Sequence, residues 1–273
     1  MLIKLSDINL NLEELRSSAG VSKSIIFIHG FSGSSNDWKF VPAKIKEGYN
    51  LYAVDLPGHG KSGSPEDIKA YRTSSLINQL FSLLNFIQGS EIILAGYSMG
   101  GRAALQLAVN FPGRLNGLIL ESASAGIAED RARLERIEAD EKLAHFIETR
   151  SIEEFADYWM GLDLFNTQKI LGKEKLAAVK KAKLSNNKTG LANSLRGFGA
   201  GSMPPVFDSL KTIGIKTLLI TGKLDVKFTG MNALMAALLP SADHKIITNA
   251  GHNVHLEQPD KFCGAVNAYI KKL

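Results

Sequence analysis

The sequence predicts an α/β protein with a mostly parallel, twisted sheet, flanked by helices and carrying an inserted helical segment. Short apolar runs recur at intervals suited to strands, at 25–28, 51–54, 92–95, 118–120, 217–220 and 245–247. Such uninterrupted runs are typical of parallel strands that are buried on both faces. Longer amphipathic segments alternate with them, at 74–88, 101–111, 230–239 and 260–272. These segments are suited to the crossover helices of a doubly wound sheet.

The regular alternation stops between residues 127 and 205, where the sequence becomes charged and helical in pattern. An insertion between two strands of one sheet lies above the edge at which those strands end. We therefore expect a core formed by residues 1–126 and 206–273, and a helical lid formed by residues 127–205. Pro204 and Pro205 are expected to mark the return to the core, because proline ends helices.

The composition is that of an ordinary globular protein, since 45% of its 273 residues are hydrophobic and 22% are charged. The net charge is +5, but the lysines and arginines are dispersed among acidic residues and form no basic stripe. We therefore expect an anionic small-molecule substrate and no nucleic acid partner. Cys263 is the single cysteine, which excludes an internal disulfide and a multi-thiolate metal site. We expect it to be a buried residue of a helix.

Neither a membrane span nor a signal peptide is predicted. No apolar run reaches the roughly 18 residues that a span requires, and residues 1–7 lack the basic-then-apolar pattern of a signal peptide. We therefore expect a cytoplasmic protein, and we expect it to act as a monomer. No motif calls for a metal or an organic cofactor, so none is expected.

The strongest chemical signal is the segment Gly96-Tyr97-Ser98-Met99-Gly100-Gly101, which directly follows the predicted strand 92–95. Strand, tight glycine turn and helix together form a nucleophile elbow, which projects the serine hydroxyl at the carboxyl edge of the sheet. The alternative is a serine that only caps the helix. The strand in front of the motif, and the partners that follow it in the chain, favour Ser98 as the nucleophile or base.

A serine hydroxyl needs an imidazole within hydrogen-bond reach and a carboxylate that orients this imidazole. Asp225 comes just after the predicted strand 217–220, and His252 lies in a glycine-bearing loop after the last predicted strand. This chain order, serine, acid and then histidine, is the one that the elbow motif requires. The alternative for Asp225 is an acid in a polar turn. His255 competes with His252, and we expect His255 to position the loop instead.

Two backbone amides are the candidates for an oxyanion hole. The segment 29–34 follows the predicted strand 25–28, and its glycines let the chain bend back toward the elbow. The N–H groups of Phe31 and Met99 would then point at one spot, where they would hold a developing negative charge. The alternative is an ordinary turn.

These elements, in this order, resemble the α/β-hydrolase superfamily over essentially the whole chain. One further residue narrows the resemblance. Arg102 lies one turn after Ser98, and helical side chains lean toward the helix N-terminus, so Arg102 can present a cation beside the serine hydroxyl. An esterase for neutral esters has little use for such a charge. The alternative is a surface arginine on an amphipathic helix.

A closer resemblance is carried by the segments 96–102, 120–127, 136–140, 155–159, 164–165, 222–228 and 251–255. Together they resemble the 2-succinyl-6-hydroxy-2,4-cyclohexadiene-1-carboxylate synthases of menaquinone biosynthesis. The likeness includes the lid, which usually diverges fastest in this superfamily. The resemblance implies a lyase that eliminates pyruvate from 2-succinyl-5-enolpyruvyl-6-hydroxy-3-cyclohexene-1-carboxylate. It also implies that Ser98 and His252 together act as the base.

The resemblance further implies a site for a substrate with three carboxylates. Arg102 and Arg136 match cationic positions of the family, and Tyr97 and Trp159 match its pocket aromatics. Each of the lid residues also has a structural alternative. Arg136 is spaced i, i+4 from Asp140, as in ordinary surface pairs, and Trp159 is equally suited to a small lid core.

The chain departs from the family at the third cation. The family commonly supplies an arginine near residues 181–187, where this chain has only lysines. Lysine is a point charge without the bidentate fork of arginine. Lys183 is our candidate for this position, with Arg196 as the substitute.

Rival functions remain open, because the predicted triad does not decide between them. The main rival is a serine hydrolase of the same fold, acting on a carboxylic ester or on a carbon–carbon bond next to a carbonyl. Arg102 and Arg136 favour the anionic substrate and thus the lyase. A catalytically silent binding protein is the rival from another class, and the complete triad argues against it.

Overall fold

The computed structural model describes residues 1–273 except 6, 7, 88 and 90. Within this part of the chain, an 8-stranded sheet has the order β1-β2-β4-β3-β5-β6-β7-β8. Strand β1 pairs with β2, and β2 pairs with β4, in antiparallel fashion, and all other neighbours are parallel. The strands are β1 (Leu2–Lys4), β2 (Asn9–Arg16), β3 (Lys23–Ile28), β4 (Asn50–Val54), β5 (Glu91–Tyr97), β6 (Gly117–Glu121), β7 (Thr217–Gly222) and β8 (Ala242–Ile247).

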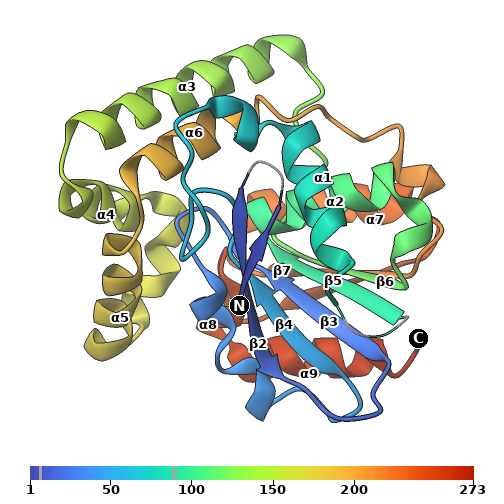
Figure 1. Cartoon of the computed structure of the whole chain (residues 1–273). Helices are drawn as coiled ribbons and strands as arrows, with labels where there is room; N and C mark the ends of the chain where they lie inside the picture. Colours follow the sequence, from blue (N-terminus) through green and yellow to red (C-terminus); the bar gives the residue numbers. More distant parts are fainter. Residues whose placement is uncertain (6–7, 88, 90) are drawn as a thin grey trace.

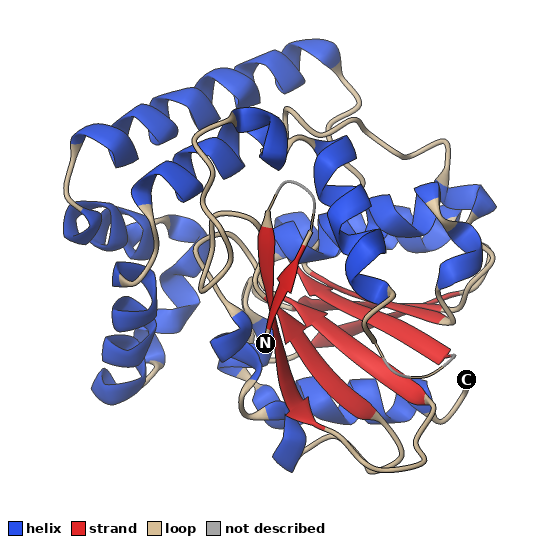
Figure 2. Ribbon diagram, in the orientation of Figure 1, coloured by secondary structure: helices blue, strands red, loops and turns tan. Residues whose placement is uncertain are grey.

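Helices cover both faces of the sheet, as Figure 2 shows. The α-helices are α1 (Thr73–Leu84), α2 (Met99–Asn110), α3 (Asp130–Thr149), α4 (Ile152–Gly161), α5 (Lys173–Leu184), α6 (Lys188–Phe198), α7 (Val226–Leu238), α8 (Val254–Glu257) and α9 (Pro259–Ile270). Short 3₁₀ helices are η1 (Ser35–Trp38), η2 (Val41–Ala43), η3 (Ile68–Tyr71), η4 (Pro112–Arg114), η5 (Asp163–Ile170) and η6 (Leu210–Thr212).

The central strands are apolar throughout because both of their faces are buried. In β3, Ile26 and Ile28 belong to the core that includes side chains of α1, α2 and α7. Ile25 and Phe27 point to the opposite face, into the core that includes side chains of α9. Successive strand residues point to opposite faces of a sheet. The run at 25–28 therefore supplies two hydrophobic cores at once.

The order of the strands places a crevice at β3 and β5. The chain runs from β3 to β4 on one side and then returns to β5 on the other side of β3. Ligands of open α/β sheets bind outside the carboxyl ends of the strands at such a switch point. The loop 29–34 follows β3 and Ser98 follows β5, so these two candidate elements lie at this crevice.

The segment 127–205, which we expect to be a lid, contains α3, α4, η5, α5 and α6. In Figure 1 these helices lie together beyond one end of the sheet. They have a small core of their own, formed by Ala144, Ile147, Phe155, Leu191, Ala192 and Leu195. Arg196 of α6 is held by ion pairs with Glu141 and Glu148 of α3. None of the described helices is long and apolar enough to cross a membrane.

The predicted α/β fold class is confirmed, and several boundaries differ from the prediction. The antiparallel strands β1 and β2 were not among the predicted elements. Helix α2 begins at Met99 and α7 at Val226, before their predicted starts. Helix α1 spans Thr73–Leu84, whereas the prediction extended to residue 88, which lies outside the described residues. Cys263 is a buried residue of α9.

Candidate active site

Ser98 occupies a strained turn between β5 and α2. Its φ is +49° and its ψ is −107°, a region that costs a non-glycine residue roughly 1–3 kcal/mol. The backbone on both sides is hydrogen-bonded: the Ser98 N–H donates to the Glu121 carbonyl at 2.8 Å, and the Arg102 N–H donates to the Ser98 carbonyl at 3.0 Å. The neighbouring strand and the helix therefore hold the serine in this conformation.

Gly100 lets this turn pack directly against the end of β3. A Cβ at this position would overlap the backbone carbonyl oxygens of Ile28 and His29, which cannot move aside as a flexible side chain can. We expect Gly100→Ala to lower the free energy of unfolding by about 1–3 kcal/mol, as other overpacked sites do. Urea denaturation would measure the change. Gly113→Ala, where a Cβ meets no atom within 4 Å, is the control. Equal stability of the two variants would contradict this packing argument.

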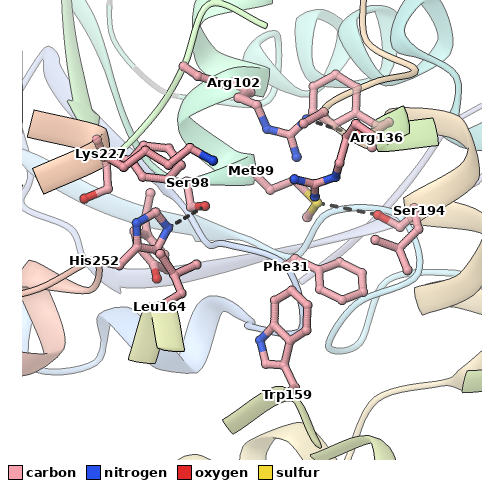
Figure 3. Close-up of a pocket in the computed structure, with 18 of the residues that line it drawn as sticks. Phe31, Ser98, Met99, Arg102, Arg136, Trp159, Leu164, Ser194, Lys227 and His252 are labelled. Atoms are coloured by element: carbon pink, nitrogen blue, oxygen red, sulfur yellow. Dashed lines mark hydrogen bonds between the residues drawn. The ribbon is translucent and has the colours of Figure 1, made fainter. Parts of the chain in front are cut away.

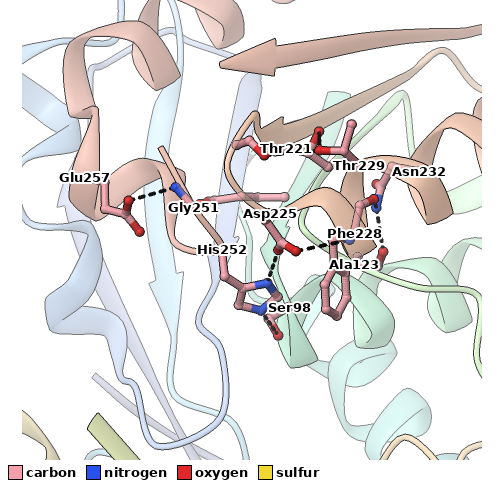
Figure 4. Close-up of polar contacts among 12 residues, drawn as sticks. Ser98, Ala123, Thr221, Asp225, Phe228, Thr229, Asn232, Gly251, His252 and Glu257 are labelled. Carbon is pink, nitrogen blue, oxygen red and sulfur yellow. Dashed lines mark hydrogen bonds and ion pairs between the residues drawn. The ribbon is translucent and has the colours of Figure 1, made fainter. Parts of the chain in front are cut away.

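Ser98, His252 and Asp225 form a continuous hydrogen-bonded chain, shown in Figure 4. The His252 Nε2 lies 3.1 Å from the Ser98 Oγ, and the His252 Nδ1 lies 2.7 Å from the Asp225 Oδ2. Because an ionised carboxylate only accepts, Nδ1 carries the proton and Nε2 is left to accept from the hydroxyl. The Phe228 N–H donates to the other Asp225 oxygen at 3.1 Å. His252 is 2% exposed and Asp225 8%, so little solvent competes for these bonds.

Buried acids support the loop that carries His252. The Gly251 N–H donates to the Glu257 carboxylate at 2.7 Å, and burial raises the pKa of Glu257. His255 pairs with Glu121 at 2.7 Å, and its ring stacks on Trp38 at 4.2 Å. The contacts of His255 are thus with Glu121, the residue whose carbonyl accepts from the Ser98 amide.

Phe31 and Met99 lie on the two sides of the crevice. Phe31 belongs to the loop after β3, and Met99 is the first residue of α2, where amide groups have no partner within the helix. Gly30 lets this loop approach the elbow, since a Cβ there would lie 2.6 Å from the Tyr97 ring. Both Phe31 and Met99 line the same cavity as Ser98 and His252.

This cavity has a volume of about 280 Å³ and is cationic (Figure 3). Arg102, Arg136 and Lys227 line it together with Ser98 and His252. The cations come from α2, α3 and α7, so core and lid both contribute charge. Anions are favoured in a partly enclosed site with this charge.

The guanidinium of Arg102 is anchored by the lid. Its Nη1 donates to the Phe198 carbonyl at 2.9 Å, and its carbon lies 5.1 Å from the centre of the Phe198 ring. Burial, and secondly the nearby Arg136, lower the pKa of Arg102 to about 10. The group is still protonated near neutral pH. Its remaining N–H donors are available to a carboxylate.

Arg136 both pairs within its helix and lines the cavity. Its Nε donates to the Asp140 carboxylate at 2.8 Å, the i, i+4 pair that the spacing indicates. Burial raises the pKa of Asp140, and the attraction of Arg136 opposes this rise. The pair therefore holds the Arg136 side chain at the cavity wall.

Aromatic side chains close the remaining wall. Trp159 lies 5.0 Å from Phe31 between ring centres, and Tyr97 lies 5.5 Å from His252. Burial raises the pKa of Tyr97 well above its usual range. The Trp159 Nε1 is buried and has no hydrogen-bond partner among the described residues.

The two candidates for the third cation, Lys183 and Arg196, lie in different places. Lys183 does not line the large cavity: it lies in a neighbouring pocket of about 40 Å³, and its Nζ donates to the Ser32 Oγ at 2.9 Å. Arg196 does not line this cavity either, and it forms ion pairs with Glu141 and Glu148 within the expected lid.

Lys227 was missed by the sequence reasoning. It is exposed, lines the cavity and forms no ion pair with a described carboxylate. Its position two residues after Asp225, in the first turn of α7, is the signal that could have found it.

The whole-chain comparisons agree with this geometry. Residues 23–259 match the model of the alpha/beta hydrolase fold family. A protein of Salmonella paratyphi C (strain RKS4594), a 2-succinyl-6-hydroxy-2,4-cyclohexadiene-1-carboxylate synthase, is 30% identical over 86% of this chain and 89% of its own. A protein of Bacillus subtilis (strain 168), provisionally named as the same synthase, is 36% identical over 92% of both chains.

Solved structures give the same assignment. The structure of MenH from S. aureus has a TM-score of 0.91 and 33% sequence identity, over 96% of this chain and 98% of that chain. A thermophilic esterase from Thermogutta terrifontis has a TM-score of 0.84 at 22% identity, over 100% of this chain and 98% of that chain, which is a likeness of fold alone. The chain therefore belongs to the α/β-hydrolase fold family and, within it, to the 2-succinyl-6-hydroxy-2,4-cyclohexadiene-1-carboxylate synthases.

Proposed function

We propose that this protein is a lyase of menaquinone biosynthesis. Its reaction eliminates pyruvate from 2-succinyl-5-enolpyruvyl-6-hydroxy-3-cyclohexene-1-carboxylate and yields 2-succinyl-6-hydroxy-2,4-cyclohexadiene-1-carboxylate. The observation that carries the proposal is one cavity that holds the Ser98–His252 pair beside Arg102, Arg136 and Lys227. A general base and several cations in one site suit proton removal from a substrate with several carboxylates.

The bonds of this substrate indicate which proton leaves. The ring carbon that bears the succinyl group is adjacent to a ketone, so its C–H is the acidic one. Its electrons form the new 2,3 double bond, the former 3,4 double bond becomes the 4,5 bond, and the C–O bond to the enolpyruvyl group breaks. The departing enolate takes up one proton on carbon and becomes pyruvate. One proton is removed and one is returned, so the reaction balances without water.

Each part of the site has a role in this proposal. The Ser98 oxygen takes the ring proton while His252, oriented by Asp225, takes the hydroxyl proton. The amides of Phe31 and Met99 hold the ketone oxygen as negative charge moves onto it. No acyl-enzyme forms, so the serine is a base here and not a nucleophile.

The cations and aromatic side chains would bind the substrate. Arg102, Arg136 and Lys227 are matched in number to the three carboxylates, and an arginine can hold a carboxylate with two parallel hydrogen bonds. The side chains of Trp159 and Tyr97 complete the pocket. The tricarboxylate substrate, a monomeric state and a cytoplasmic location are parts of this proposal.

The deciding measurement is pyruvate release from 2-succinyl-5-enolpyruvyl-6-hydroxy-3-cyclohexene-1-carboxylate. We expect rapid release by the wild-type protein and a loss of at least about 10²-fold in Ser98→Ala, because positioned general bases contribute on this scale. Ser124→Ala, which alters another serine of the cavity wall, is the matched control and should keep most of the rate.

A different outcome would move the function to a serine hydrolase. Release no faster than the spontaneous reaction, together with intact hydrolysis of a nitrophenyl ester, would leave the hydrogen-bonded triad in place and overturn the lyase proposal.

A further inference from the structure

The loop that carries the Phe31 amide has an unusual residue at its next position. Ser32 has a φ of +60° and is 1% exposed. A buried non-glycine residue keeps such a conformation only where its surroundings impose it. The contacts around Ser32 therefore fix the backbone directly after Phe31, and in this way they limit where the Phe31 amide can lie.

Two of these contacts come from the lid. The Lys183 Nζ of α5 donates to the Ser32 Oγ at 2.9 Å. The Asn186 Nδ2, from the connection between α5 and α6, donates to the Ser32 carbonyl at 3.0 Å. Both the side chain and the backbone of Ser32 are thus bound by a segment more than 150 positions away in the chain.

The surroundings of Lys183 are more suitable for a hydrogen-bond donor to the protein than for a cation that binds the substrate. Its pocket has a volume of only about 40 Å³ and is separate from the large cavity. Burial lowers the pKa of Lys183 to about 8, and the attraction of Asp37 opposes this shift. Phe31 and Trp159 belong to the walls of both spaces, so their rings stand between Lys183 and the large cavity.

We propose that Lys183 and Asn186 are positioning residues, which hold the Phe31 amide in place for the oxyanion through Ser32. This inference depends on the oxyanion role of Phe31 in the proposed function, and it assigns Lys183 to the catalytic step and not to carboxylate binding. It also means that the lid must be docked for the oxyanion hole to be complete.

The test uses Lys183→Met and Asn186→Leu in the full chain, each with two substrates. We expect kcat to fall about 10- to 100-fold with both the tricarboxylate and a neutral nitrophenyl ester, while KM changes little, since a misplacement of about 1 Å can cost on the order of 10²-fold. Lys181→Met, an exposed lysine of the same helix, is the matched control. Thermal unfolding of each variant would show that it is folded.

A double-mutant cycle gives a readout that a general packing defect would not. If Lys183 acts through the Ser32 hydroxyl, combining Lys183→Met with Ser32→Ala should lower kcat no further than the larger single change, because contacting residues are not additive. Additive losses would overturn the inference.

The substrates distinguish the competing explanations. A higher KM for the tricarboxylate with unchanged ester hydrolysis would make Lys183 a substrate cation and overturn the inference. Wild-type kcat in both variants would overturn it as well. If pyruvate release fails but the ester is hydrolysed, the lyase proposal falls and the ester still tests the positioning role. If only the lyase reaction is measurable, a lower kcat supports the positioning role, and a higher KM with unchanged kcat overturns it.

Discussion

Asp225→Asn is expected to lower the kcat of pyruvate release by about 10⁴-fold, the loss that the equivalent change causes in serine proteases. The His252 Nδ1–H donates a hydrogen bond to the Asp225 carboxylate, with 2.7 Å between nitrogen and oxygen. An asparagine that turns its amide toward the ring donates to Nδ1 instead, which leaves the proton on Nε2. His252 then cannot take the Ser98 proton, although every heavy atom is close to its original place.

The measurement is single-turnover pyruvate release, with substrate affinity followed separately. Asp243→Asn is the matched control, because Asp243 is a partly exposed residue in an ion pair with Lys272 and its replacement should leave the rate intact. A rate within tenfold of wild type for Asp225→Asn would show that the imidazole orientation is not needed, and the base would have to be sought elsewhere.

Arg102→Ala should also lower the activity strongly, and the size of this loss should depend on the substrate. Truncating one partner of a buried, hydrogen-bonded charge pair costs about 2–5 kcal/mol, or at least roughly 30-fold in kcat/KM. We expect this loss for the tricarboxylate, while slow hydrolysis of a neutral nitrophenyl ester is spared. Equal losses on both substrates would contradict a carboxylate-binding role and would indicate damage to the neighbouring elbow.

Lys227→Met provides a comparison within the same experiment. Lys227 is exposed, so water screens its charge and its loss should reduce kcat/KM for the tricarboxylate by less than the loss of Arg102 does. The ester should again be unaffected. Comparing the loss of kcat/KM in the two variants thus tests whether burial of a cation strengthens its interaction with the substrate.

The fold class and the family could be predicted because the strongest signals are local. The elbow from Gly96 to Gly101 combines a buried strand, a glycine turn and a helix within a few residues. The comparisons confirm the family that these motifs indicate. The roles of the individual side chains stay predictions until the variants are measured.

The antiparallel strands were missed because their pattern is different. In β2 the buried Leu10 and Leu12 alternate with polar residues, and the second half of the strand is only partly buried. A search for uninterrupted apolar runs finds strands that are buried on both faces, and it misses strands of this alternating kind. The period-2 alternation of polar and apolar residues over 9–13 would have been the appropriate signal.

The third cation could not be predicted from spacing, because it depends on how the lid docks. Lys183 lies in the expected stretch of sequence, but its Nζ reaches Ser32. Lys227 faces the cavity only because α7 begins directly after Asp225. Both outcomes follow from packing between segments that are far apart in the chain.

The triad residues each follow a different strand, β5, β7 and β8, whereas Arg136 and Trp159 belong to the inserted segment. The hydrogen-bonded chain of Ser98, His252 and Asp225 therefore belongs to the core alone, whereas the cations of the cavity come from the core and the insertion together. Mutations in the insertion can change which molecule is accepted without disturbing proton transfer on the sheet.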